Sequence, residues 1–294
     1  MINAIISLAV MGAIFGIILG IANKKFVVDI DPRVEAITNA LPGANCGGCG
    51  FPGCGGYAEA IVVGTAPLDA CGPGKDEVRK KIAGIMGADV GESKERKVAQ
   101  LMCNGGQDKA VSLYEYEGIL DCYTAKTMFG GPKVCSYSCI GLGSCIDACP
   151  FGCITMGDNH LPIIDYDLCV GCNKCVEYCP QSVIQLIDAS KLVHVRCSNR
   201  DKGKLAKEAC QVACIKCKLC EKNCPEGAIA VVDNGAGGLA EIDYSKCTNC
   251  GICVNKCPTN AIEKIMPINI EAINKEDTNN TQSSVACNNC GLCK

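Results

Sequence analysis

The chain opens on a long apolar run. Residues 1–23 carry no charged side chain, and Ala4–Ala22 is almost wholly hydrophobic. At about 1.5 Å per helical residue this stretch reaches about 28 Å, close to the hydrocarbon thickness of a bilayer. The pattern predicts a single transmembrane helix over residues 1–25. Lys24 and Lys25 then place the rest of a single-pass protein on the cytoplasmic side of the inner membrane. A cleaved signal peptide is disfavoured because no basic residue precedes the run.

Short hydrophobic pairs recur through the second half of the chain and predict the starts of β-strands. They are Val183-Ile184, Ala228-Ile229 and Ala261-Ile262. Each follows a Cys-x2-Cys-x2-Cys-x3-Cys-Pro run, and the three runs span residues 169–180, 214–225 and 247–258. This is the spacing of bacterial ferredoxins, in which three cysteines hold one [4Fe–4S] cluster and the fourth holds its neighbour. Three copies of the same run favour iron–sulfur clusters over zinc.

Composition and charge narrow the function further. Cysteine accounts for 28 of the 294 residues, a density that is usual only in much shorter, disulfide-rich secreted proteins. The predicted cytoplasmic location instead makes these thiols metal ligands. A net charge of -3 offers no basic surface for nucleic acid. No Walker loop, flavin motif or catalytic constellation occurs, so we expect no catalytic residue in this chain.

A fourth copy of the cysteine run is altered. It spans residues 139–150, and Leu142 stands where the middle cysteine is expected. Five cysteines of this region recur 75 residues later: Cys122, Cys135, Cys139, Cys145 and Cys149 align with Cys197, Cys210, Cys214, Cys220 and Cys224. The chain therefore contains a duplicated module, and Cys135 is the nearest replacement for the lost ligand.

The ferredoxin rule then assigns four clusters, two in each module. The predicted ligand sets are Cys135, Cys139, Cys145 and Cys179; Cys149, Cys169, Cys172 and Cys175; Cys214, Cys217, Cys220 and Cys257; and Cys224, Cys247, Cys250 and Cys253. The predicted fold class is α+β, with tandem two-cluster ferredoxin-like modules over residues 122–190 and 191–268.

A glycine-rich constellation precedes the modules. Cys46, Cys49, Cys54 and Cys71 follow the spacing Cys-x2-Cys-x4-Cys-x16-Cys, which predicts a fifth [4Fe–4S] cluster in a small domain over residues 26–74. A linker over residues 75–121 would join this domain to the modules. Glycines let the backbone approach a cluster and donate N–H groups to its sulfurs. The embedded Gly-x-Gly-x-x-Gly match is no dinucleotide site, because no strand precedes it and Pro52 interrupts it.

Five clusters of four leave eight of the 28 cysteines unassigned: Cys103, Cys122, Cys153, Cys197, Cys210, Cys287, Cys290 and Cys293. The last three form a Cys-x2-Cys-x2-Cys tail within residues 269–294. They would hold a sixth cluster with a fourth ligand from Cys103, Cys122, Cys153, Cys197 or a partner, or they would stay without metal. Plain buried thiols are the alternative for Cys103, Cys122 and Cys197.

The chain resembles the B subunits of Rnf electron transport complexes, in their long clostridial or acetogen form. The resemblance rests on two sequence motifs, Asn-Cys-Gly-Gly-Cys-Gly at residues 45–50 and Cys-Ile-Gly-Leu-Gly-Ser-Cys at residues 139–145. It implies an electron-transfer subunit of an ion-translocating ferredoxin:NAD oxidoreductase that receives electrons from soluble reduced ferredoxin. It also implies membrane partners with flavins and Fe–S centres, a peripheral NAD-reducing subunit, and a membrane-proximal cluster on Cys46, Cys49, Cys54 and Cys71.

Two other functions stay open on the sequence alone. The chain could serve a membrane hydrogenase or a formate-type dehydrogenase, although such subunits would not need the Cys46–Cys71 domain. A static, zinc-bound interaction scaffold is the other reading, and iron and sulfide analysis would separate it from an electron carrier.

Overall fold

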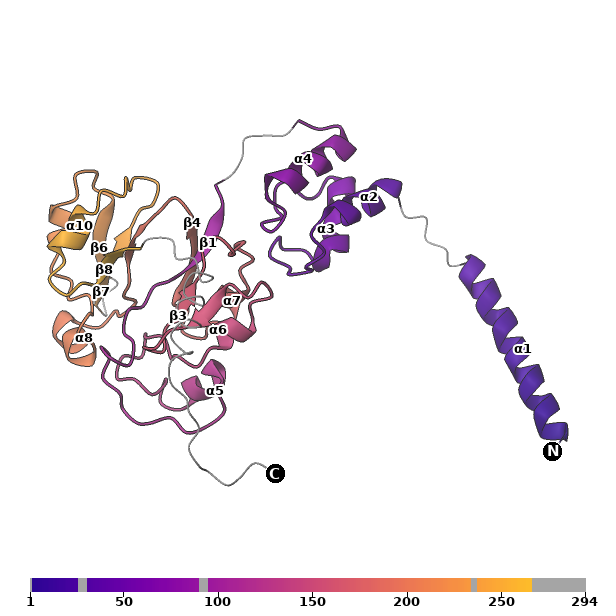
Figure 1. The fold of residues 1–294 in the computed structure, drawn as a ribbon, viewed down its shortest axis with the longest axis horizontal. Helices are drawn as coiled ribbons and strands as arrows, with labels where there is room; N and C mark the ends of the chain where they lie inside the picture. The colour runs from indigo at the N-terminus through magenta and orange to yellow at the C-terminus, as the bar shows by residue number, and fades with distance from the viewer. Residues whose placement is uncertain (1, 26–30, 90–94, 234–236, 266–294) are drawn as a thin grey trace, which may run out of the picture.

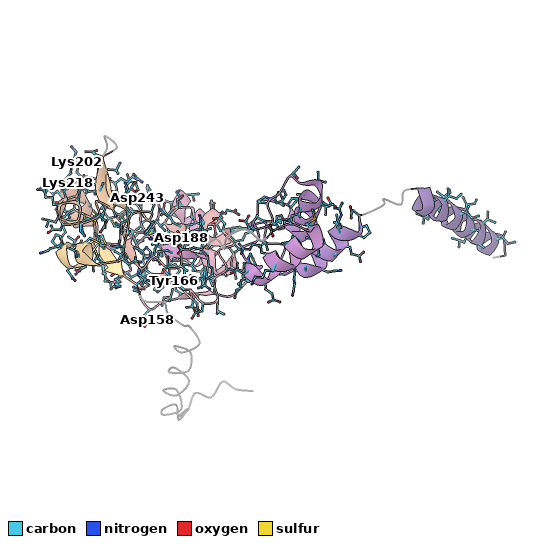
Figure 2. All side chains as sticks on the ribbon, turned by 90° about the horizontal axis from the view of Figure 1, so that it is seen from above. Asp158, Tyr166, Asp188, Lys202, Lys218 and Asp243 are labelled. Atoms are coloured by element: carbon cyan, nitrogen blue, oxygen red, sulfur yellow. The ribbon has the colours of Figure 1, made fainter. Side chains whose placement is uncertain are left out.

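The computed structural model describes residues 2–25, 31–89, 95–233 and 237–265. These residues form an N-terminal helix, a small helical unit and two modules built from short strands and helices (Figure 1). Figure 2 shows Tyr166 and Asp188 on the first module, with Lys202, Lys218 and Asp243 on the second. Three separate clusters of buried apolar residues underlie the helical unit and the two modules.

The N-terminal helix α1 (Ile2–Lys25) does not have the predicted role. Among the described residues, no helix combines the length and the apolarity needed to cross a membrane, so the predicted transmembrane helix over residues 1–25 is wrong.

The helical unit consists of α2 (Pro32–Ala40), α3 (Gly53–Val63) and α4 (Lys75–Met86). Asp31 caps α2 by accepting a hydrogen bond from the N–H of Arg33 at 2.9 Å. Ile37, Tyr57 and Ile82 bring one fully buried side chain from each helix into a shared core. The helix α4, which the sequence placed in a linker, therefore packs within this unit. The hydroxyl of Tyr57 donates to the carbonyl of Pro67 at 2.7 Å and ties the chain beyond α3 to the core.

The first module contains two antiparallel strand pairs and three short helices. Its elements are β1 (Lys97–Leu101), α5 (Cys122–Thr127), α6 (Ser144–Asp147), β2 (Ile154–Met156), β3 (Pro162–Ile164), α7 (Lys174–Glu177) and β4 (Ile184–Asp188). Strand β1 pairs with β4, and β2 pairs with β3. The register that joins Val98 to Ile187 and Leu101 to Ile184 sets apolar side chains of both strands in the buried core.

The second module repeats this plan. Its elements are β5 (Val193–Val195), α8 (Gly203–Ala209), α9 (Leu219–Lys222), β6 (Ile229–Asp233), β7 (Gly238–Ile242), α10 (Ile252–Lys256) and β8 (Ile262–Lys264). Strand β5 pairs with β8, and β6 pairs with β7, both antiparallel. Short two-stranded sheets with intervening helices agree with the α+β, ferredoxin-like architecture predicted for the modules.

Matching hydrogen bonds show where each module begins. The N–H of Met102, just after β1, donates to the carbonyl of Val183 at 2.7 Å. The N–H of Arg196, just after β5, donates to the carbonyl of Ala261 at 2.8 Å. Strand β1 is thus the counterpart of β5, and the first module starts within the segment that the sequence assigned to a linker. The two copies differ by an insertion after β1, which includes α5.

Candidate iron–sulfur sites

Cysteine side chains surround five hollows among the described residues, each of about 320–370 Å³. The cysteines that line them are Cys46, Cys49, Cys54 and Cys71; Cys122, Cys139, Cys145 and Cys179; Cys103, Cys135, Cys197 and Cys210; Cys214, Cys217, Cys220 and Cys257; and Cys224, Cys247, Cys250 and Cys253. Four thiolates are the donor set of a cysteine-bound [4Fe–4S] cluster, so each hollow has the required ligands.

The first hollow lies in the helical unit. The loop before α3 turns sharply at Gly47, Gly50 and Gly53, whose positive φ angles of 70°, 86° and 90° favour glycine. The side chain of Asn45 holds this loop by accepting a hydrogen bond from the N–H of Cys54 at 2.8 Å. Burial raises the pKa of Cys71 to about 11. A thiol in this setting becomes a thiolate when a metal binds it, which couples metal binding to proton release.

The second hollow contains a cysteine that the sequence assignment missed. Cys122 joins Cys139, Cys145 and Cys179, whereas Cys135 lies at a different hollow. Asp121 caps α5 through the N–H of Thr124 at 2.7 Å, and the N–H of Cys122 donates to the hydroxyl of Ser144 at 2.8 Å. These contacts fix the start of α5 against α6. The signal available in the sequence was the aspartate before Cys122, which marks the start of a helix but not a ligand.

The second predicted ligand set includes one cysteine of α7, Cys175. Its members are Cys149, Cys169, Cys172 and Cys175. Burial raises the pKa of Cys175, and thiolates at Cys169, Cys172 and Cys149 raise it further. The N–H of Ala99 donates to the Sγ atom of Cys169 at 3.4 Å. Cys153 stands beside this set, with its Sγ atom 3.4 Å from that of Cys149. A hydrogen bond from Cys153 lowers the pKa of Cys169.

The second module brings together both of its predicted ligand sets. The two sets use the same local geometry after each Cys-Pro pair. The N–H of Ala228 donates to the Sγ atom of Cys224, and the N–H of Ala261 donates to the Sγ atom of Cys257, both at 3.3 Å. Hydrogen bonds to ligand sulfurs stabilise the more negative, reduced state of a cluster and so tune its potential.

A compact site for one metal ion is not found. Within residues 2–25, 31–89, 95–233 and 237–265, no three His, Cys, Asp or Glu side chains could hold a single metal ion together. The predicted tail ligands Cys287, Cys290 and Cys293 lie outside the described residues. His194 is fully buried and shares a hydrogen bond of 2.9 Å with the hydroxyl of Tyr244, so its place in the structure is in the core.

Protein-family models match four stretches that contain these cysteines. A family of Fe–S cluster domains matches residues 41–73, two families of 4Fe-4S binding domains match residues 136–152 and 162–185, and a 4Fe-4S dicluster domain matches residues 213–261. Together they support several [4Fe–4S] clusters in this chain.

Curated relatives cover most of the chain. It is 46% identical over 244 residues to the B subunit of a proton-translocating ferredoxin:NAD⁺ oxidoreductase complex from Clostridium ljungdahlii, spanning 83% of this chain and 84% of that protein. It is 45% identical to the B subunit of an ion-translocating oxidoreductase complex from Methanosarcina acetivorans, over 84% of this chain and 92% of the relative. It is 44% identical to the B subunit of a Na⁺-translocating ferredoxin:NAD⁺ oxidoreductase complex from Acetobacterium woodii, over 84% and 74% respectively.

Proposed function

We propose, on the premise that the chain belongs to the B-subunit family of ion-translocating ferredoxin:NAD⁺ oxidoreductase (Rnf) complexes, that soluble reduced ferredoxin is its electron donor. The chain is an Fe–S electron-transfer subunit of such an oxidoreductase complex, and the other Rnf subunits are its partners. Single electrons enter and leave this subunit, and the NAD⁺-reducing chemistry belongs to a peripheral subunit of the assembly.

The contact between the helical unit and the first module supports the part of this proposal that concerns electron transfer within the chain. Gly48, in the loop of the first hollow, lies so close to Cys172 that a Cβ atom on it would be 2.7 Å from that residue's carbonyl oxygen. A Cβ atom on Gly72 would lie 2.7 Å from the carbonyl oxygen of Val170. The two ligand-bearing loops of the helical unit therefore approach the ligand loop of the module, which supports electron transfer between the two.

Five [4Fe–4S] clusters follow from the four-cysteine sets. We assign one to Cys46, Cys49, Cys54 and Cys71 in an N-terminal Fe–S domain, and two to each ferredoxin-like module. In the first module, Cys122 takes the place of Cys135 beside Cys139, Cys145 and Cys179, because it lines the same hollow. The other four sets keep the cysteines that their spacing predicts.

The proposed location of this chain in the cell follows from its membership of an Rnf complex. Rnf complexes are membrane-associated, and we place the bulk of this chain at the cytoplasmic side of the inner membrane, where soluble ferredoxin is available. Flavin-bearing and Fe–S membrane subunits would hold it there. Relatives of nearly equal identity are named for proton and for Na⁺ translocation, so similarity in this subunit does not distinguish the coupling ion.

The substitution Cys54→Ala in complex-containing membranes tests the proposed path. We expect it to remove about four irons, those of the N-terminal cluster, and to abolish ferredoxin-driven NAD⁺ reduction. The clusters of the modules should keep their electron paramagnetic resonance signals. A matched control is Val63→Ala, since that side chain is 74% exposed at the end of α3. Normal activity in the Cys54 variant would remove this cluster from the electron path.

A further inference from the structure

Four cysteines outside the assigned clusters meet between the two modules. Cys103, Cys135, Cys197 and Cys210 line a hollow of about 320 Å³, and all four are at most 8% exposed. Two of them come from the first module and two from the second. No matched family domain includes any of the four, since those domains cover residues 41–73, 136–152, 162–185 and 213–261.

The two pairs occupy equivalent places in the modules. Cys103 follows β1 by two residues, and Cys197 follows β5 by two residues. The N–H of Cys139 donates to the Sγ atom of Cys103 at 3.4 Å, and the N–H of Cys214 donates to the Sγ atom of Cys197 at 3.3 Å. Cys135 and Cys210 each precede those donors by four residues. Equivalent pairs of thiols, one pair from each module, therefore line one hollow.

We propose that Cys103, Cys135, Cys197 and Cys210 bind a further [4Fe–4S] cluster at the interface between the two modules. The donor set is the one that such a cluster requires, and the thiols surround a hollow of the same size as the other cysteine-lined hollows. This inference goes beyond the proposed function because it concerns metal content and not the donor or acceptor of the electrons.

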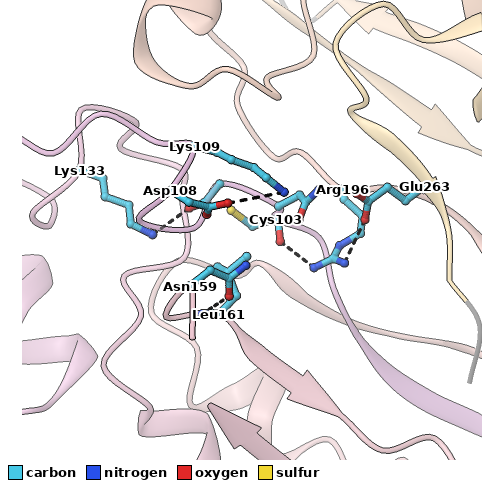
Figure 3. Close-up of polar contacts among 10 residues, drawn as sticks. Cys103, Asp108, Lys109, Lys133, Asn159, Leu161, Arg196 and Glu263 are labelled. Atoms are coloured by element: carbon cyan, nitrogen blue, oxygen red, sulfur yellow. Dashed lines mark hydrogen bonds and ion pairs between the residues drawn. The ribbon is translucent and has the colours of Figure 1, made fainter. Parts of the chain in front are cut away.

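Polar groups around the hollow suit a negatively charged occupant. The side chain of Asn199, only 1% exposed, donates from Nδ2 to the Sγ atom of Cys135 at 3.2 Å. Lys133 is 5% exposed, and its ammonium donates to the carbonyls of Gly105 and Cys139 at 2.8 Å each. Figure 3 shows Lys133 and Arg196 on either side of Cys103. A buried cation is costly without nearby negative charge, which a cluster with four thiolates supplies.

The loop beside the hollow leaves room for such a group. A Cβ atom on Gly105 would lie 3.1 Å from the Sγ atom of Cys210 and 3.7 Å from that of Cys103. Glycine therefore lets the backbone pass close to two of the thiols. The guanidinium of Arg196 secures the other side of this loop by donating to the carbonyl of Cys103 at 3.0 Å.

A cluster at this interface would join the redox sites of the two modules. Cys139 lines the hollow in the first module that Cys122 also lines. Cys214 lines a hollow in the second module. Each donates its backbone N–H to a ligand of the interface site. One electron received from the first module could thus be passed to the second through a site that is hydrogen-bonded to both.

The interface cluster can be tested by measuring the iron and sulfide content of the full chain, purified without oxygen. We expect Cys103→Ala and Cys197→Ala each to lose about four irons and four sulfides, because all four thiols hold one cluster. The double variant should lose no more than either single variant. As a matched control, Cys71→Ala combined with Cys197→Ala should lose about eight. Unchanged iron in the Cys197 variant, or a loss of about eight in the Cys103/Cys197 variant, would overturn the proposal.

A second variant keeps every thiol and guards against misfolding. Asn199→Ala removes the hydrogen bond to Cys135 and should leave the iron content unchanged. It should make one cluster harder to reduce in a redox titration followed by electron paramagnetic resonance, because a donor to a ligand sulfur favours the reduced state. A full set of unchanged midpoint potentials would contradict the placement of a cluster on Cys135. Both measurements are independent of ferredoxin and NAD⁺, so they can fail while the proposed function stands.

Discussion

The backbone N–H of Cys139 donates a hydrogen bond to the Sγ atom of Cys103 at 3.4 Å. The same contact recurs in the second module between Cys214 and Cys197 at 3.3 Å. Cys103 is therefore the structural counterpart of Cys197. Since Cys103, and not Cys122, occupies the position equivalent to Cys197, we assign Cys122 to the set of Cys139, Cys145 and Cys179. In this set Leu142 stands where a cysteine is expected.

Iron counts from two variants can separate the positions of Cys122 and Cys135. The thiols line different hollows, so we expect each single alanine substitution to cost about four irons and the double substitution about eight. The sequence-based assignment left Cys122 outside the five clusters and named it as one possible fourth ligand for the tail cysteines. With Cys122 unassigned, that assignment predicts no loss for Cys122→Ala and about four irons for the double variant.

The control for this comparison is Ser138→Ala. Ser138 is buried at the same hollow as Cys135, but its hydroxyl donates to the carbonyl of Cys135 and it offers no thiol. Its iron content should match that of the unmodified chain. A loss of only four irons in the Cys122/Cys135 double variant would place both thiols on one cluster and refute the structural assignment.

Local spacing predicted the cysteine sets where the ligands lie in one short run. In the second module both predicted sets surround hollows, since an x2 spacing fixes three thiols around one turn and only the fourth comes from a distance. The fourth ligand of the altered run could not be found in this way. Cys103 and Cys135 are 32 residues apart and Cys197 and Cys210 only 13, so a constant offset of 75 residues misaligned Cys122.

Long-range pairing also escaped the sequence. Strand β1 is five residues long and pairs with β4, with Val98 opposite Ile187. Nothing near residues 97–101 marks them as part of a module, because the partner strand decides this at long range. The apolar pattern of residues 1–25 predicted a helix correctly and its transmembrane role wrongly. Periodicity and composition thus identify elements better than they identify what those elements contact.

Gly48→Ala tests the close approach of the helical unit to the first module. The added Cβ atom would stand 2.7 Å from the carbonyl oxygen of Cys172, so the two loops must move apart. Such overpacking costs about 1–3 kcal/mol in a well-packed contact. We expect ferredoxin-driven NAD⁺ reduction by membranes to fall several-fold while the iron content stays unchanged, because the ligands remain but the electron-transfer distance grows.

The matched control is Gly55→Ala, in the first turn of α3. No atom lies within 4 Å of a Cβ on Gly55, so the same chemical change meets open space. Alanine also favours a helix over glycine by up to about 1 kcal/mol. Activity should be retained in this variant. Equal activity in the Gly48 and Gly55 variants would show that the approach of Gly48 to Cys172 does not limit electron transfer.

Lys133→Met tests whether the buried ammonium stabilises reduced clusters. Methionine keeps much of the length of the side chain and removes its positive charge. Lys133 donates to the carbonyl of Cys139, which lines one hollow, and to that of Gly105, which borders another. Loss of an interaction of about 1 kcal/mol should lower a one-electron midpoint potential by roughly 40 mV. A redox titration of the anaerobic protein measures this shift.

The exposed Lys204 provides the control for charge alone. Lys204→Met changes the net charge of the chain equally, but solvent screens an exposed ammonium. All potentials should stay within a few millivolts of their original values in this control, by the same screening argument. Potentials that do not move in Lys133→Met would mean that the buried charge contributes nothing to the redox properties of either site.

His194→Gln tests a pH-dependent contribution to stability. Burial of the imidazole lowers the pKa of His194 to about 4, and Arg196 adds a smaller effect in the same direction. The ordinary value is about 6.5, so between these values the unfolded chain binds a proton that the folded chain does not. This contribution is complete above pH 6.5 and is lost as the pH falls toward 4, by about 3 kcal/mol.

The measurement compares unfolding midpoints of the two proteins in anaerobic denaturant titrations between pH 7 and pH 4.5. Glutamine can still hydrogen-bond to the hydroxyl of Tyr244 but does not titrate, so its stability should fall less steeply toward acid pH. Acid loss of iron affects both proteins and cancels in their difference. His160→Gln is the control because His160 is exposed, and its profile should follow that of the unmodified protein. Parallel profiles for the His194 variant and the unmodified protein would show that a neutral, buried His194 does not set the acid limit of stability.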